Sequence, residues 1–323
     1  MRQKLPGKSL AELCALFGIS RQAYYLAHHN AKRTNISHMV ILALVAEFRA
    51  AVPMLGTRKL LHMLGPELKK HDIKMGRDQL FELLRFHGLL MRRRKRYVKT
   101  TNSHHWLKRY PNLIKNMLLT APEQLWVSDI TYIRTLDGFS YLSLITDAYS
   151  RKIVGYALHP NLEAAGCIAA LYMAIESRKR EHPFILVHHS DRGIQYCSQN
   201  YVSILNADRI AISMTQTGSP YENAMAERVN GIIKNEFSPE LIYKNHKEAK
   251  DNIVLIIRNY NSKRPHASLD YLTPDQAHGI SGQLNKRWKQ YPYVKNGSQK
   301  EGLAKEKTEE ILKKSKATEI RLT

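Results

Sequence analysis

Cysteine is scarce in this sequence of 323 residues. The three cysteines, Cys14, Cys167 and Cys197, are far apart and include no CxxC pair. This argues against a disulfide framework or a cysteine zinc site, and it fits a reducing, intracellular compartment.

The longest apolar stretches, such as residues 39–48, are too short to cross a bilayer. Glu12 interrupts the amino-terminal segment before an apolar region of signal length. We therefore expect a cytoplasmic protein with no membrane contact.

Acidic residues are also few for a chain of this size. The 28 Asp and Glu residues stand against 50 Lys and Arg residues, so the formal net charge is 50 − 28 = +22. A chain this basic most often binds a polyanion, because neutralising phosphates releases condensed counterions. A basic housekeeping enzyme or a ribosome-associated protein is the alternative. The charge favours a nucleic-acid partner.

The amino-terminal residues 9–25 predict two short helices around a tight turn. Ser9 and Glu12 can form a capping box at the first helix. Ser20 can cap the second helix, which would expose Arg21 as a candidate DNA contact. This is the helix-turn-helix pattern of DNA-binding proteins. Any small pair of helices is the alternative.

A second helical unit follows, with amphipathic patterns at 37–51, 56–64 and 76–88. Gly65-Pro66 is expected to stop the middle helix, because proline lacks the amide proton that the helix needs. The last helix is a second candidate for reading DNA, with Arg77 at its start.

A strongly basic segment joins these helices to the rest of the chain. Residues 85–109 contain nine Arg or Lys and no acid, and they include Tyr97 and Trp106. Such a run is usually a solvated segment. We predict that this one follows a phosphate backbone. Its candidate contacts are Arg92, Arg93, Arg94, Lys95 and Arg96.

After residue 124 the sequence becomes rich in β-branched and aromatic residues. Strands are predicted at 124–135, 139–150 and 152–159, with Asp137-Gly138 as the first hairpin turn. The other predicted elements are helices at 163–180, 199–207, 222–237 and 246–261, and strands at 184–189 and 210–215. Three antiparallel strands followed by alternating helices and strands make an α/β layer fold with one mixed sheet.

Two aspartates lie at unusual places in these strands. Asp129 lies in the middle of the first strand, where an ionised carboxylate is costly unless it is paired or binds a metal. Asp191 follows the buried strand 184–189 and precedes Arg192, a candidate DNA contact. A surface turn would explain Asp191 alone, and nearby amides would explain Asp129 alone. Neither alternative explains two aspartates placed by two different strands, so together they favour a metal-binding or catalytic site.

A third acid lies on the helix predicted at 222–237. At about 100° per residue, Glu227 shares one helix face with three polar residues, and apolar residues occupy the opposite face. Surface helices often carry such a polar stripe. Together with the two aspartates, however, it indicates a site, with Asn223, Asn230 and Lys234 as candidate DNA contacts.

Three carboxylates in a basic protein suit phosphodiester chemistry. Cleavage and transfer need charge stabilisation at both the attacking and the leaving oxygen, which two hard cations about 4 Å apart can supply. Oxygen ligands without cysteine or spaced histidine favour Mg²⁺, with Mn²⁺ as a substitute, over zinc.

Several motifs resemble one family. WVSDITYI (126–133), HSDRGIQY (189–196) and SPYENAMAERVNGIIKNEF (219–237) resemble the catalytic core of insertion-sequence transposases of the retroviral-integrase-like DDE group. Between Asp191 and Glu227 there are 227 − 191 − 1 = 35 residues, the spacing of that group. YNSKRPHASLDYLTP (260–274) resembles the segment after their core.

The resemblance implies a ribonuclease-H-like core with helices on both faces of a five-stranded mixed sheet. It implies Asp129, Asp191 and Glu227 as a triad holding two Mg²⁺ ions, and Lys234 as a DNA-contacting lysine. It further implies strand cleavage and strand transfer, with double-stranded DNA (terminal inverted repeats and target) as partner and a homo-oligomer in the DNA complex. In many relatives a separate upstream frame encodes a helix-turn-helix. Here residues 9–25 precede the core in one chain, which leaves open whether such a partner is needed.

The expected organisation has five parts. They are a helix-turn-helix at 1–35, a second helical domain at 36–95, a basic linker at 96–120, the catalytic core at 121–284 and a basic tail at 285–323. Two other functions fit the same residues: a DNA-binding regulator with an inactive core, and a cellular nuclease that cuts without joining. Inverted repeats in the DNA outside the gene would favour the transposase.

Overall fold

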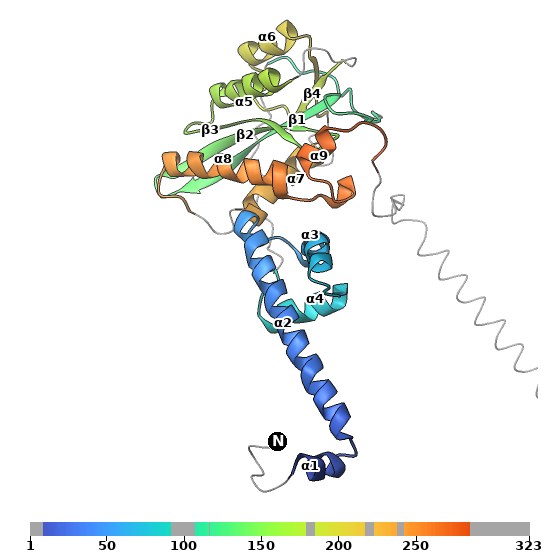
Figure 1. Cartoon of the computed structure of the whole chain (residues 1–323). Coiled ribbons are helices and arrows are strands. Elements are labelled where there is room, and N and C mark those ends of the chain that lie inside the picture. The colour runs from blue at the N-terminus through green and yellow to red at the C-terminus, as the bar shows by residue number, and fades with distance from the viewer. Residues whose placement is uncertain are drawn as a thin grey trace, which may run out of the picture. The chain divides into compact units, whose positions relative to one another are not determined.

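The computed structural model describes residues 9–91, 107–115, 117–178, 185–216, 223–237 and 242–284. Figure 1 shows the order of the elements along the chain. Two predicted features lie outside the described residues: the basic contacts Arg92, Arg93, Arg94, Lys95 and Arg96, and the tail at 285–323. In the part that is described, no helix combines the length and the apolar character needed to span a membrane.

The chain begins with two helices, α1 (Leu10–Leu16) and α2 (Arg21–Ala51). Ser9 and Glu12 form the predicted capping box of α1, and the Ser20 hydroxyl accepts a hydrogen bond at the start of α2. The prediction of separate helices before residue 25 and at 37–51 was wrong, because α2 runs through both without a break. Neither glycine nor proline occurs between Arg21 and Ala51, so nothing in the backbone ends the helix. The expected domain boundary at residues 35 and 36 falls inside α2.

The next two helices are α3 (Thr57–Lys70) and α4 (Arg77–Phe86). The predicted stop at Gly65-Pro66 was wrong, because α3 continues through both residues. Pro66 lies on the exposed side of the helix, while leucines spaced four residues apart remain buried before and after it. Packing of that stripe therefore outweighs the one hydrogen bond that proline removes. The stripe consists of Leu60, Leu64 and Leu68.

Five strands form the predicted mixed sheet, in the order β3-β2-β1-β4-β5. The strands are β1 (Leu125–Thr135), β2 (Gly138–Asp147), β3 (Ile153–His159), β4 (Val187–Ser190) and β5 (Ala211–Met214). The first three pair antiparallel, whereas β4 pairs parallel to both β1 and β5. The predicted hairpin is confirmed with its turn one residue earlier: Thr135 pairs with Gly138, and Leu136 and Asp137 form the turn.

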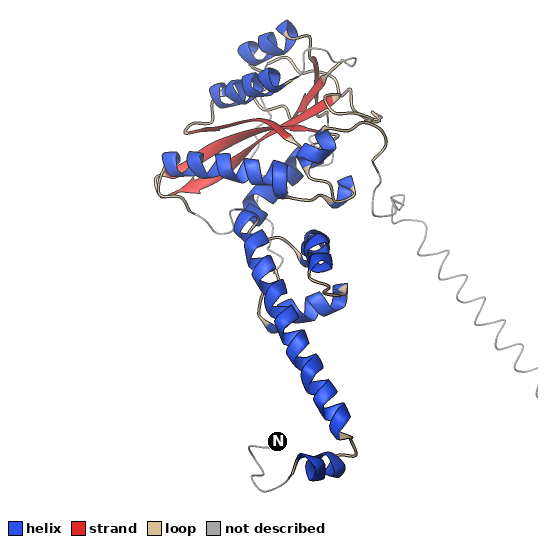
Figure 2. Cartoon of the chain, viewed as in Figure 1, coloured by secondary structure: helices blue, strands red, loops and turns tan. Residues whose placement is uncertain are grey.

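Helices cover both faces of this sheet (Figure 2). They are α5 (Ala164–Ser177), α6 (Gln199–Ala207), α7 (Ala224–Ile232), α8 (His246–Lys263) and α9 (Pro274–His278). A π-helical turn, η1 (Ile233–Phe237), continues α7, and a 3-10 turn, η2 (Ala267–Leu269), follows α8. The figure shows α5 and α6 on one face and α7 and α8 on the other. This layering confirms the ribonuclease-H-like α/β core.

One glycine sets how closely α5 approaches the sheet. A Cβ atom on Gly155 in β3 would lie 2.1 Å from the Ala170 carbonyl oxygen and 2.8 Å from the Ala174 Cβ. Only glycine fits at this distance, because the obstacle is helix backbone. The close contact holds the α5 layer against β3 and leaves the opposite face of the sheet to α7 and α8.

Candidate active site

The strand β1 presents its side chains alternately to the two helical layers. Trp126 packs in the same apolar cluster as Cys167 of α5, and Val127 packs with Ala226 of α7. Because side chains two residues apart share a face, Asp129 and Thr131 point with Val127 toward α7. The position of Asp129 in the strand therefore determines which helix it faces.

The parallel pairing of β1 with β4 brings the second aspartate alongside. Val127 pairs with His189, so continuing the register by two residues aligns Asp129 with Asp191, directly after β4. Neighbouring strands lie about 4.8 Å apart, and aligned residues point to the same face. Asp191 also makes the predicted turn, since its Oδ1 accepts a hydrogen bond from the Gly193 amide at 2.9 Å. Asp191 therefore has both predicted features: it forms a turn, and it lies beside Asp129.

The carboxylate of Asp129 lies in a partly buried, negatively charged environment. Burial raises its pKa to about 7, and the negative charges of Asp191 and then Glu227 add to that rise. Two hydrogen bonds act in the opposite direction: Asn230 Nδ2 donates to Oδ2 at 2.8 Å, and the Ile130 amide donates to Oδ1 at 2.9 Å. Asp191 and Glu227 thus both lie near enough to act electrostatically on Asp129.

The polar stripe of α7 and η1 packs onto β1. Asn223 Nδ2 donates to the Ser128 carbonyl at 3.1 Å, and Lys234 Nζ donates to Thr131 Oγ1 at 3.1 Å. Burial lowers the pKa of Lys234, while the charge of Asp129 acts to raise it. The stripe is therefore a contact surface with the strand that carries Asp129.

Glu227 lies in the first turn of α7, on the same side, and its side chain is exposed. A helix amino terminus favours a carboxylate. Among the residues that the structure describes, no three His, Cys, Asp or Glu side chains come together closely enough to hold one metal ion. Glu227 is therefore near the two aspartates without forming a finished three-ligand site with them.

The residues present suit a hard divalent cation. Asp129 and Asp191 offer carboxylate oxygens from adjacent strands, and Mg²⁺ is commonly held by one or two carboxylates with water and substrate phosphate as its other ligands. A cation would also offset the repulsion that raises the pKa of Asp129. The donor set fits Mg²⁺ or Mn²⁺ better than zinc.

The other predicted DNA contacts are dispersed. The Arg192 guanidinium donates to the backbone carbonyls of Thr215 and Gln216, at the end of β5. Arg21 is exposed at the start of α2. Arg77 is exposed at the start of α4 and pairs with Asp78, with Nε and Oδ1 2.8 Å apart. These residues do not join the acids in one place.

Two further residues, Thr131 and Gly193, contribute to the site and were not predicted from the sequence. Thr131 receives the Lys234 hydrogen bond, and it lies two positions after Asp129 on the same strand face. That period of two was a signal that could have identified it. Gly193 supplies the amide for Asp191, and a Cβ atom there would lie 3.0 Å from the Asp191 Oδ1.

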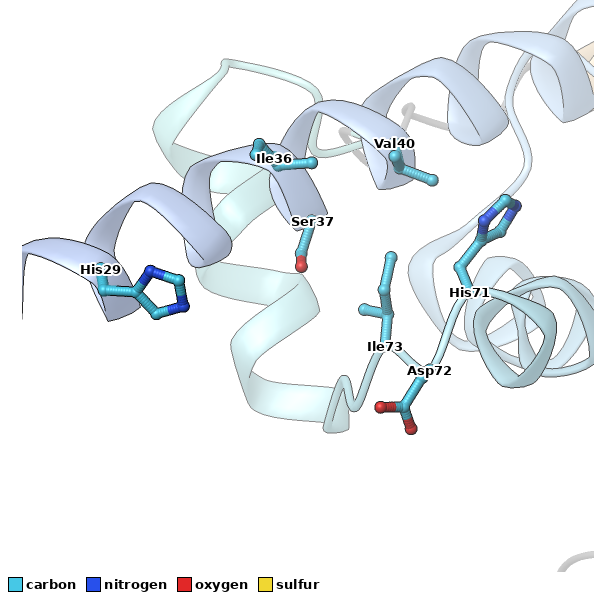
Figure 3. Close-up of a pocket in the computed structure, with 7 residues that line it drawn as sticks. All are labelled: His29, Ile36, Ser37, Val40, His71, Asp72 and Ile73. Atoms are coloured by element: carbon cyan, nitrogen blue, oxygen red, sulfur yellow. The ribbon is translucent and has the colours of Figure 1, made fainter. Parts of the chain in front are cut away.

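A hollow of about 580 Å³ lies elsewhere, against α2 and the connection between α3 and α4. Figure 3 shows Ile73 pointing toward α2, where Ser37 and Val40 lie. His71 and Asp72 also line it. None of the three predicted acids contributes to its wall, so it is separate from the candidate active site.

The chain is similar to integrase core domains and to proteins of insertion elements. Residues 120–220 and 208–274 each match an integrase core domain. The 31 kDa protein of insertion element IS600 from Shigella sonnei is 34% identical over 270 residues, which cover 81% of this chain and 96% of that protein. The transposase for IS629 from the same species is 31% identical, covering 65% of this chain and 70% of its own.

Two further similarities complete the comparison. The transposase InsF for IS3fB of Escherichia coli is 28% identical and covers 83% of this chain and 93% of its own length. The catalytic core domain of HTLV-2 integrase in complex with magnesium is 19% identical, and the match covers 49% of this chain and 97% of that domain with a TM-score of 0.38. The integrase core domain matches, and both the IS600 protein and the IS629 transposase are more than 30% identical and covered over more than two thirds of their lengths, so the chain belongs to the integrase-core family of insertion-sequence transposases, which act in DNA transposition.

Proposed function

We propose that this chain cleaves a DNA strand at each end of its own mobile element and then transfers the freed 3′-OH to target DNA. Asp129, Asp191 and Glu227 would hold the metal, expected to be two Mg²⁺ ions with Mn²⁺ as a substitute. The observation that supports this most strongly is the parallel pairing of β1 with β4, whose register continues toward Asp129 and Asp191, together with the pKa of Asp129, which burial raises to about 7. Bound metal would stabilise charge on the attacking and leaving oxygens.

The neighbouring side chains would position these acids and the DNA. The Asn230 amide fixes one oxygen of Asp129 and leaves the carboxylate directed toward α7. Asn223 ties the start of α7 to β1 through the Ser128 carbonyl, which sets where Glu227 begins. Lys234, held near Asp129 by Thr131, would place a DNA phosphate beside the acids. The protein's contribution is then positioning and charge neutralisation.

The proposed partners follow from the reaction. Double-stranded DNA carrying the terminal inverted repeats, and target DNA, would be the substrates. Two ends held together call for a homo-oligomer, and an upstream-frame helix-turn-helix protein is a further candidate partner. Arg21, Arg77 and Arg192, with the basic residues 92–96, are proposed to contact DNA.

Two other functions make different predictions. A regulator with an inactive core would bind the same DNA and cleave none of it with Mg²⁺ or Mn²⁺ present. A cellular nuclease would cleave without joining, and its gene would lack flanking inverted repeats. Sequencing the flanking DNA and assaying both cleavage and joining therefore separates the three.

Mg²⁺ affinity should increase with pH up to about 7. Asp129 must be deprotonated to bind a cation, so below its pKa of about 7 each binding event displaces a proton. We expect about tenfold tighter binding per pH unit below that value and a plateau above it. Calorimetric titration with MgCl₂ across this range would show the slope, and Asp129→Asn should abolish it. A pH-independent affinity would contradict the assignment of Asp129 as a ligand.

The same raised pKa affects stability when metal is absent. An unfolded aspartate has a pKa of about 3.9, below the folded value of about 7. The folded state therefore holds this proton more tightly, and the contribution of Asp129 favours folding at low pH. That contribution is lost as the pH increases through the folded pKa.

A further inference from the structure

A second polar cluster, away from the acids of β1 and β4, surrounds the fully buried Tyr260 of α8. The Tyr260 hydroxyl donates to the Arg151 carbonyl at 2.9 Å. The Arg264 guanidinium lies 5.9 Å from the centre of the tyrosine ring, and the His266 ring meets it edge-on at 5.2 Å. The turn between β2 and β3 and the segment after α8 therefore meet at one tyrosine.

Two cations of this cluster share a single carboxylate. Arg264 donates to both oxygens of Glu236 in η1, at 2.6 and 2.8 Å. Lys59 of α3 donates to the same carboxylate at 3.0 and 3.2 Å. Burial, and then the charge of Arg264, lower the pKa of Lys59 to about 8. Each oxygen of Glu236 thus accepts one hydrogen bond from Arg264 and one from Lys59, so this carboxylate does not neutralise further cations.

Two more cations lie beside this group without a carboxylate of their own. The guanidinium of Arg151 contacts the Ala148 carbonyl and the Met225 thioether. Arg228 is exposed three residues after Met225 on α7, which places it on the same helix face. In the described part of the chain, no ion pair joins Arg151 or Arg228 to an acid. The carboxylate whose charge acts on Arg151, Asp147, is already engaged by the Glu123 amide and Ser150.

A buried imidazole nitrogen in the same cluster also lacks a partner. His266 is 6% exposed, and its Nε2 has no hydrogen-bond partner in the described structure. Burial holds the pKa of His266 well below its ordinary value, and the charges of Arg264 and Lys59 lower it further. Burying a polar atom or a guanidinium without a matching partner is costly. Four cations (Lys59, Arg151, Arg228 and Arg264) against two carboxylates (Glu236 and Asp147) leave a local excess of 4 − 2 = 2 positive charges.

We propose that Arg151 and Arg228, which lie beside the buried Lys59–Glu236–Arg264 group, form a binding site for a backbone phosphate of DNA. A phosphodiester supplies the oxyanion that the guanidinium forks match. Because Arg228 directly follows Glu227, a phosphate held there would fix the DNA relative to α7. The choice of DNA as the ligand rests on the proposed function.

The test uses the full chain and the salt dependence of its DNA affinity. Arg228→Gln removes one exposed charge, and Arg258→Gln, also exposed on α8, is the matched control. Each neutralised phosphate contributes about 0.9 to the slope of log affinity against log salt. We expect Arg228→Gln to reduce that slope by about 0.9 on any duplex sequence, whereas Arg258→Gln leaves it unchanged. Equal slopes for the two variants would overturn the proposal.

Two further measurements distinguish a DNA site from a small-anion site, and this proposal from the proposed cleavage function. Inorganic phosphate offers the same oxyanion, so it is titrated at constant ionic strength while the Tm is followed. A Tm increase that depends on Arg228, combined with an unchanged DNA slope, would mean a small-anion site and would overturn the DNA assignment. Cleavage is measured on the same preparations. A slope reduced by Arg228→Gln in a chain that never cleaves DNA would support this site while refuting the proposed function.

Discussion

Replacing Asp129 with asparagine should reduce metal-dependent DNA cleavage by on the order of 10³-fold or more. Removing a metal-binding carboxylate forfeits several kcal/mol of transition-state stabilisation, and each 1.36 kcal/mol is about tenfold in rate. The single carbonyl oxygen of the new amide can accept the hydrogen bond that Asn230 now donates, and the hydrogen bond from the Ile130 amide of the same strand is then lost. The side chain keeps its size and β1 keeps its pairing with β2, so the fold should remain and the loss of activity should be chemical.

Stability distinguishes this loss from misfolding. Asp129→Asn removes the charge that Asp191 and Glu227 repel, so the metal-free variant should be at least as stable as wild type above pH 7. DNA affinity should be unchanged or slightly higher, since a negative charge near phosphate is gone. Asp137→Asn, in the exposed hairpin turn, is the matched control and should retain full activity. Cleavage by Asp129→Asn within tenfold of wild type would refute its role.

Arg264→Ala should destabilise the chain by about 3–5 kcal/mol, because it removes a buried ion pair with two hydrogen bonds to Glu236. Arg264 is 3% exposed and donates to both Glu236 oxygens. After the substitution, Lys59 alone would neutralise Glu236. Urea unfolding at neutral pH measures the loss, and Arg258→Ala on the exposed side of α8 should change stability by less than about 0.5 kcal/mol.

A double-mutant cycle assigns the loss to the ion pair. The double variant Arg264→Ala/Glu236→Gln lacks both members of the pair, so its loss of stability should be smaller than the sum of the two single losses. A coupling energy of about 1–3 kcal/mol is expected for such contacting residues. If the two substitutions add without coupling, the pair contributes nothing specific, and Arg264 acts only through packing against Tyr260.

The sheet and the placement of its acids could largely be predicted from sequence. Residues 124–135 and 139–150 carry strong strand composition, and the glycine of Asp137-Gly138 fixes the hairpin, so local chemistry determines both. Asp129 and Asp191 could be identified as candidate site residues because a carboxylate is unusual at their positions. Asp129 lies inside an apolar strand, and Asp191 directly follows one. Their alignment depends on β1 pairing parallel to β4, which the α/β order already favoured.

What could not be predicted depends on contacts distant in sequence. Asn230 meets Asp129 across 101 residues, and Lys59 meets Glu236 across 177. The stripe on α7 showed which face is polar, but not that Asn223 and Asn230 are buried against β1. The continuation of α3 through Pro66 likewise depends on tertiary packing, which outweighs a local helix-stop signal.

Strand cleavage and joining by the purified chain tests the central claim most directly. The substrate is labelled duplex DNA ending in the element's inverted repeat, with Mg²⁺ or Mn²⁺, and wild type is run beside Glu227→Gln, which nearly preserves size while removing the charge. We expect cleavage and joining by wild type and neither by Glu227→Gln, with DNA affinity retained in both. Equal activity in the two proteins would contradict the assignment of Glu227, and DNA binding without cleavage in either would contradict the transposase chemistry itself.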